Sequence, residues 1–161
     1  MIIMGIDPGI ALMGFSLVEK AGSRINLIDF GVIETSKSLA DPQRLLRIYE
    51  ELCLLLEKYS PEELAVESLY FTNNQKTAFQ VGQARGVVLL TGAQKGIPVF
   101  SYTPNEIKVA VTGYGRAGKK QVQEMVMRLT GLKEIPKPDD AADAVAAGIC
   151  HLYSRKIKVL K

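Results

Sequence analysis

The sequence predicts an α/β domain in which a mixed five-stranded sheet carries helices on both faces. The first 36 residues consist of short apolar runs separated by turn residues, which is typical of consecutive strands. Between residues 41 and 100, helical periodicity alternates with two further short apolar runs. The rest of the chain shows helical patterns with proline or glycine at their starts. A strand meander followed by alternating helices and strands gives a sheet that is covered on both faces.

The predicted meander has strands over residues 2–6, 15–19 and 25–34. The first of these runs is almost continuously apolar, as expected for a central strand that is covered on both sides. Turn residues at 7–9 end it, and turn residues at 21–23 separate the second strand from the third.

Helices and strands then alternate. We expect Asp41 to be the N-cap of the first helix, with Pro42 as its first helical residue, and Pro61 to follow its end. A fourth strand is predicted over residues 64–67, and a long helix after it runs to about Gln94.

The last third of the sequence follows a turn and a fifth strand within residues 96–100. Thr103 and Pro104 are expected to start a short helix, and Gly118 precedes another. Prolines at 136 and 138 introduce the final helix.

Composition limits the class of protein. The chain has 161 residues, which we expect to form a single domain spanning residues 1–161. Hydrophobic residues make up 47%, but no apolar run reaches the roughly 18 residues that a membrane span needs, so no membrane partner is expected. The N-terminal run has no basic segment before it, which argues against a signal peptide. With two cysteines interpreted as buried thiols, a cytoplasmic location is expected.

Four acidic residues, far apart in the sequence, lie where a single cluster would need them. Asp7 follows the first strand and Glu67 ends the fourth, and the two are neighbours if these strands pair side by side. Asp140 and Asp143 share one face of the last helix, where surrounding alanines allow a close approach to the sheet. Carboxylates this close raise one another's pKa, so we expect two Mg²⁺ ions, with Mn²⁺ as a possible substitute.

Each of these residues also has a plainer interpretation. Asp139 and Asp140 fit an N-cap and a first-turn charge of the last helix, and Asp143 fits a solvated face. The combination with the two strand carboxylates favours a metal site and, with it, hydrolysis of a phosphodiester by water.

The chain has one histidine, which nearly excludes histidine-based metal or triad chemistry. This residue, His151, lies more than two turns beyond Asp143 and is interpreted as an ordinary helix residue.

Six segments in register along the chain carry a resemblance to a known family. They are Asp7-Pro8-Gly9, Val66-Glu67, Gly82-Gln83-Ala84-Arg85-Gly86, Tyr102-Thr103-Pro104, Lys119-Lys120-Gln121-Val122-Gln123 and Asp140-Ala141-Ala142-Asp143-Ala144. Over essentially its whole length the chain resembles the RuvC family of bacterial Holliday-junction resolvases, which are ribonuclease H-like nucleases.

The resemblance implies a ribonuclease H-like fold and a Mg²⁺-dependent endonuclease. Such an enzyme cuts four-way DNA junctions as a homodimer during recombination and repair, in cooperation with the branch-migration proteins RuvA and RuvB. The family's four catalytic carboxylates fall on Asp7, Glu67, Asp140 and Asp143. Asp139 precedes the family's segment and is interpreted as an extra charge or as a substitute for Asp140.

Five residues are expected to contact DNA. Lys119 and Lys120 stand at a helix start, where free amides and the helix dipole favour a phosphate. The resemblance places Lys108 and Lys119 near the scissile phosphate. Tyr70 and Phe71 begin the polar loop after the fourth strand, where an aromatic ring either stacks on bases opened at the crossover or packs in the core.

A dimer is expected because two symmetric cuts require two active sites related by a two-fold axis. Ala78, Gly82 and Gly86 recur every four residues along the long helix and form a smooth ridge. This ridge either makes the dimer contact or seats the helix on its own sheet.

Two other function classes are compatible with parts of the sequence. Residues 113–119 match most of the phosphate-binding loop of a nucleotidase, after a strand-like run over 107–112, but Lys120 stands where Ser or Thr is needed. A non-catalytic junction-binding module would leave the four carboxylates without a role. Metal-dependent cleavage of four-way DNA separates the nuclease from both alternatives.

Overall fold

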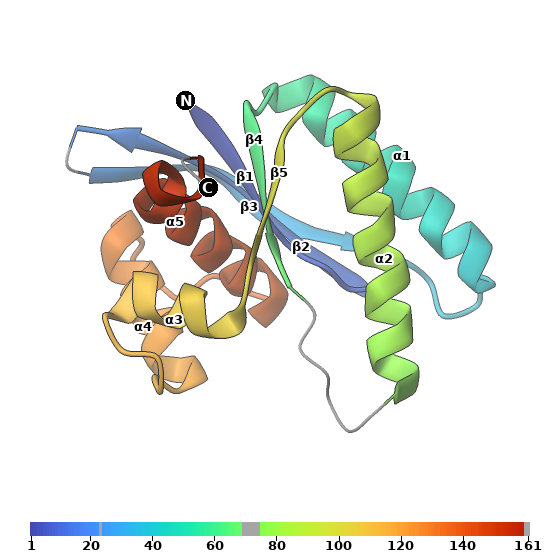
Figure 1. Ribbon diagram of the computed structural model, residues 1–161. Helices are drawn as coiled ribbons and strands as arrows, with labels where there is room; N and C mark the ends of the chain where they lie inside the picture. Colours follow the sequence, from blue (N-terminus) through green and yellow to red (C-terminus); the bar gives the residue numbers. More distant parts are fainter. Residues whose placement is uncertain (23, 69–74, 160–161) are drawn as a thin grey trace.

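A computed structural model describes residues 1–22, 24–68 and 75–159, which form a sheet with helices on both faces (Figure 1). The five strands are β1 (Ile2–Asp7), β2 (Leu12–Ala21), β3 (Arg24–Glu34), β4 (Glu63–Glu67) and β5 (Val99–Tyr102). They lie in the order β3-β2-β1-β4-β5. β1, β2 and β3 pair antiparallel, whereas β4 and β5 run parallel to β1. The predicted mixed sheet, and the pairing of the first strand with the fourth, are confirmed.

Five helices form the two outer layers. They are α1 (Asp41–Tyr59), α2 (Gln75–Gln94), α3 (Pro104–Thr112), α4 (Lys119–Thr130) and α5 (Asp139–Val159). α1 and α2 cover one face of the sheet, and α5 crosses the other face with α3 and α4 beside it (Figure 1).

Two apolar cores result from the two-residue alternation of the strands. In β1, Ile3 belongs to the core under α5, whereas Met4 belongs to the core under α1 and α2. In β4, Ala65 faces α5, and Leu64 and Val66 face the opposite layer. The same alternation directs Asp7 and Glu67, the last residues of their strands, toward the layer that contains α5.

Two details of the prediction were wrong. Asp41 is not the N-cap of α1: Ala40 takes that position, because its carbonyl already accepts hydrogen bonds from the amides of Gln43 and Arg44. The second strand was predicted too short, since β2 pairs on both sides and its ladder extends over Leu12–Ala21.

In the part of the chain that the structure describes, no helix combines the length and the apolar character that crossing a bilayer requires.

Candidate active site

Asp7 and Glu67 lie next to each other at the carboxyl edge of the parallel strands. Ile6 of β1 pairs with Val66 of β4, so the carboxylates that follow these residues come from neighbouring strands about 4.8 Å apart. This edge is where α/β sheets place their ligands.

The start of α5 lies directly against this edge because glycines leave room for its backbone. Gly14 pairs with Asp7, and a Cβ added to Gly14 would stand 1.9 Å from the carbonyl oxygen of Asp140. A Cβ on Gly5 would stand 2.1 Å from the carbonyl oxygen of Ala144. The end of β1 and the start of α5 therefore lie close together, as the predicted site at the two ends of the chain requires.

The carboxylates influence one another's charge. Burial, and then the negative charges of Glu67, Asp143 and Asp140, raise the pKa of Asp7 to about 8. Burial, and then Asp143, raise the pKa of Glu67 to about 7, and burial also raises the pKa of Asp143. Full ionisation of the cluster is therefore unfavourable without added positive charge, which a bound cation would supply.

Lysine side chains supply part of the missing positive charge. The Lys119 ammonium lies 3.0 Å from an Asp139 oxygen and 3.4 Å from an Asp143 oxygen. Burial works against its charge, but these two carboxylates outweigh burial and raise the pKa of Lys119. Burial raises the pKa of Glu67, and the positive charge of Lys108 offsets part of this increase.

These groups share a cavity of about 250 Å³ between β4, α3, α4 and α5. Glu67 and Asp143 line it together with Lys108 and Lys119. The cavity thus brings together carboxylates that can bind a metal ion and lysines that can bind a phosphate group. Lys120 is exposed and does not line this cavity.

Asp139 and Asp140 have different surroundings. Asp139 is exposed, bound to Lys119, and accepts a hydrogen bond of 3.0 Å from the Gln123 side chain on α4. Asp140 is the aspartate whose charge acts on Asp7. The neighbours of Asp139 therefore agree with an extra charge rather than with a substitute for Asp140.

The donor set fits a hard divalent cation, since carboxylate oxygens are the ligands that Mg²⁺ and Mn²⁺ prefer. Within the ranges 1–22, 24–68 and 75–159, however, three or more such side chains do not yet close around one point. The carboxylates are near enough to raise one another's pKa, and Lys119 forms an ion pair with Asp143. A cation would have to draw these oxygens together, so their role as ligands stays a prediction.

Tyr70 and Phe71, the predicted base-stacking residues, lie outside the described residues.

The nucleotidase interpretation is wrong, because the phosphate-binding loop it requires must follow a strand. Residues 104–112 instead form helix α3, which Thr103 caps by accepting a hydrogen bond from the Glu106 amide. Residues 113–118 connect this helix to α4.

His151 lies in helix α5, as expected, but the sequence did not indicate its surroundings. Its side chain is fully buried and contacts Tyr102 and Glu63 through its two ring nitrogens. The signal that could have revealed one partner is the alternation of side chains along a strand. Glu63 and Glu67 are four residues apart on β4, so both face α5.

Comparison with known proteins assigns the family. The model of the family described as crossover junction endodeoxyribonuclease RuvC matches residues 3–151. This chain belongs to the RuvC family. A RuvC from Caldicellulosiruptor saccharolyticus is 52% identical over 153 residues, covering 94% of this chain and 92% of the relative. A RuvC from Thermotoga petrophila is 53% identical over 158 residues, covering 98% and 96%.

A solved RuvC structure has the same fold. It is T. thermophilus RuvC in complex with a Holliday junction substrate, with a TM-score of 0.92 at 35% identity over 98% of this chain and 96% of that one. The ribonuclease H-like RuvC fold predicted from the sequence is confirmed.

Proposed function

We propose that this chain is a crossover junction endodeoxyribonuclease that cuts four-way DNA junctions by metal-dependent hydrolysis. The observation that carries the proposal is the proximity of carboxylates from β1, β4 and α5, of which Glu67 and Asp143 line one cavity together with two lysines. Membership of the RuvC family supports junction DNA as the substrate.

Asp7, Glu67, Asp140 and Asp143 would hold the cations, which we take to be two Mg²⁺ ions with Mn²⁺ as a substitute. A bound divalent cation supplies Lewis acidity for attack by water on a phosphodiester. The high pKa values of Asp7 and Glu67 support this role, because added positive charge would return both groups to their ionised form.

Lys108 and Lys119 would bind the phosphate that is cut, because both line the same cavity as Glu67 and Asp143. Lys119 would have to exchange its contacts with Asp139 and Asp143 for a phosphate oxygen. Lys120, exposed in the first turn of α4, would contact the DNA further out. Tyr70 and Phe71 keep their proposed role in stacking on opened bases.

The exposed side of α2 supports a homodimer. A Cβ on Gly86 would meet no atom within 4 Å, so this glycine does not seat α2 on its own sheet. That contact is made by Ala84, Val88 and Gly92 instead. Beside Gly86, at helical spacing, Phe79 is 67% exposed and Leu90 is 56% exposed, which leaves an apolar strip for a partner subunit.

A matched pair of variants tests the dimer. Leu90→Glu on α2 should convert a dimer into a monomer in size-exclusion chromatography with light scattering. Leu54→Glu is the control, since Leu54 on α1 is similarly exposed, at 59%. A dimer that survives Leu90→Glu, or is lost equally in both variants, would place the interface elsewhere.

As a member of its family the chain would cooperate with RuvA and RuvB, and it would act in the cytoplasm, where bacterial DNA is.

The central experiment is cleavage of a synthetic four-way junction beside a linear duplex of the same sequence. We expect paired, symmetric nicks in the junction with Mg²⁺ and none with EDTA. Binding without cleavage at any divalent cation would instead support a non-catalytic junction-binding module.

A further inference from the structure

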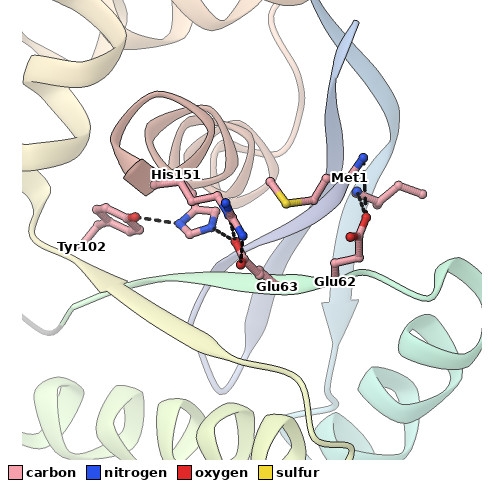
Figure 2. Close-up of polar contacts among 7 residues, drawn as sticks. Met1, Glu62, Glu63, Tyr102 and His151 are labelled. Atoms are coloured by element: carbon pink, nitrogen blue, oxygen red, sulfur yellow. Dashed lines mark hydrogen bonds and ion pairs between the residues drawn. The ribbon is translucent and has the colours of Figure 1, made fainter. Parts of the chain in front are cut away.

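Three buried polar side chains, from α5, β4 and β5, form a network with the partly exposed Arg155 of α5 (Figure 2). The Nδ1 atom of His151 lies 2.7 Å from the Tyr102 hydroxyl, and its Nε2 atom lies 2.6 Å from a Glu63 oxygen. Arg155, one turn later on α5, donates to both Glu63 oxygens at 2.7 and 2.8 Å. His151 and Tyr102 are both 0% exposed and Glu63 is 7% exposed.

The protonation states in this network make its contacts directional. The hydrogen bonds from Arg155 hold the pKa of Glu63 below its usual value, against the effect of burial. Glu63 is therefore an ionised acceptor, so the Nε2 atom of His151 carries the proton between them. Burial raises the pKa of Tyr102 well above its usual range, so its phenol keeps its hydrogen. Each contact is therefore a hydrogen bond with a defined donor and acceptor, so it constrains the relative orientation of the two groups as well as their distance.

The network lies on the same helix and the same strand as half of the acidic cluster. His151 follows Asp143 by eight residues on α5, which is roughly 12 Å along a helix. Glu63 precedes Glu67 by four residues on β4, which is roughly 13 Å along a strand. The two intervals match, so His151 meets Glu63 at one end while Asp143 and Glu67 face the same cavity at the other.

The strand β5 also connects the His151–Glu63 contact with the region around Glu67. Tyr102 pairs with Glu67 in the sheet, and its carbonyl accepts a hydrogen bond from the amide of Ser68. The residue that contacts His151 with its hydroxyl thus also holds the backbone around Glu67.

The rest of the interface between α5 and the sheet combines small residues with aliphatic side chains. Its buried helix residues include a run of alanines, and the facing strands contribute Gly5 and Gly14. Val145 and Ile149 of α5 pack in the same core as Ile3. The alanines and glycines let backbone touch backbone, which sets how deeply the helix sits but resists sliding along the helix axis only weakly. Directional bonds add to the resistance that the aliphatic side chains supply. Besides the network, one such bond runs from the Ser16 hydroxyl to the Ala144 carbonyl at 2.9 Å.

We propose that the His151–Glu63–Tyr102 network, with Arg155, sets the axial position of α5 and thereby the fit of Asp143 and Glu67 to divalent cations. This inference rests on the proposed function of the acidic cluster. His151 acts through the helix and touches neither the substrate nor the reacting atoms, so it is a positioning residue.

Direct metal binding tests the proposal without relying on catalysis. Mn²⁺ is titrated into the DNA-free protein and followed by electron paramagnetic resonance. We expect His151→Phe, which fills the space but cannot donate to Glu63, to weaken Mn²⁺ binding about tenfold. His151→Gln can still donate to Glu63 and should restore binding to within about threefold of the wild type. Junction affinity in EDTA should change less than twofold, since the basic residues remain in place.

Leu52→Ala is the control for lost stability, because Leu52 is fully buried on the opposite face of the sheet and touches no part of the network. It should lower Tm without changing Mn²⁺ affinity. If His151→Phe does not fold, Tyr102→Phe decides, since it removes one hydroxyl and leaves the contact between His151 and Glu63.

Mn²⁺ binding by His151→Phe that equals binding by Leu52→Ala would overturn the proposal. So would unchanged binding by Tyr102→Phe where His151→Phe cannot be prepared. If the wild type binds Mn²⁺ but leaves junctions uncut, the proposed nuclease function fails, and the same variants still decide the positioning role.

Discussion

The two faces of the sheet are built from different residues. The face under α1 and α2 is a conventional aliphatic core, in which Ile48 and Leu52 pack on Leu64 and Val66. The face under α5 also has an apolar core, which includes Val145 and Ile149, but it adds glycines, alanines and buried polar groups and carries all four carboxylates of the cluster. The comparison indicates that both faces bury apolar side chains for stability, and that the face under α5 in addition positions charge.

Removal of one carboxylate should have the largest effect. Asp140→Asn is expected to lower junction cleavage about 10³-fold or more, because a metal ligand is lost, while junction binding in EDTA stays within about twofold. Asp139→Asn is the matched control on the adjacent residue and should cost less than about tenfold. Near-normal nicking by Asp140→Asn, or equal losses in both variants, would contradict the assignment of the cluster.

A methyl group added between α5 and the sheet should damage both stability and cleavage. Gly14→Ala would force a shift in the backbone of Asp140, and we expect a cost of about 3 kcal/mol together with lost cleavage. On the other face, Leu52→Ala should cost about 2–5 kcal/mol, yet cleavage per folded molecule should be retained. Urea unfolding and cleavage assays below the transition measure both. Loss of cleavage in folded Leu52→Ala would erase the distinction between the faces.

The acidic cluster should destabilise the metal-free protein. Because the pKa of Asp7 is raised from 3.8 to about 8, the folded state keeps a proton that the unfolded chain releases between these values. Stability should therefore fall as pH rises through this window, and the loss should be complete above about pH 8.

Asp7→Asn removes that loss, so in EDTA its Tm should exceed that of the wild type by about 5 °C at pH 8.5, and the gain should vanish toward pH 4. Glu50→Gln, at an exposed position on α1, is the control and should change Tm little at either pH. A gain independent of pH would mean that Asp7 is not the group responsible.

Loss of a single lysine should have the smallest effect. Lys119→Ala is expected to weaken junction binding several-fold and to reduce the slope of log K against log salt by about one, as the loss of one phosphate contact does. Lys95→Ala is the control, because Lys95, directly after α2, pairs with Glu57 on α1 and does not line the cavity. Fluorescence anisotropy at several salt concentrations gives both slopes, and an unchanged slope for Lys119→Ala would exclude a phosphate contact.

Much of the fold could be predicted because the local signals agree with the tertiary structure. The apolar run before Asp7 is a central strand, and Thr103 with Pro104 starts a helix as expected. The cap of α1 was misplaced by one residue, since Asp41 and Ala40 differ only in which carbonyl accepts the first helical bonds. The contacts of His151 were not predicted, because no residue near it in the sequence indicates Glu63, which lies 88 residues away.

By itself, the sequence determined the order of the elements and the family, and it predicted the four carboxylates of the proposed site, because strand alternation, caps and motif order are local properties. Only the tertiary structure decided that Lys119 pairs with Asp139 and Asp143, that Gly14 lies under Asp140, and that His151 links α5 to β4. These contacts join segments that are distant in the chain. They depend on how closely a helix can approach a sheet, which is set by the packing of backbones and by the absence of side chains between them.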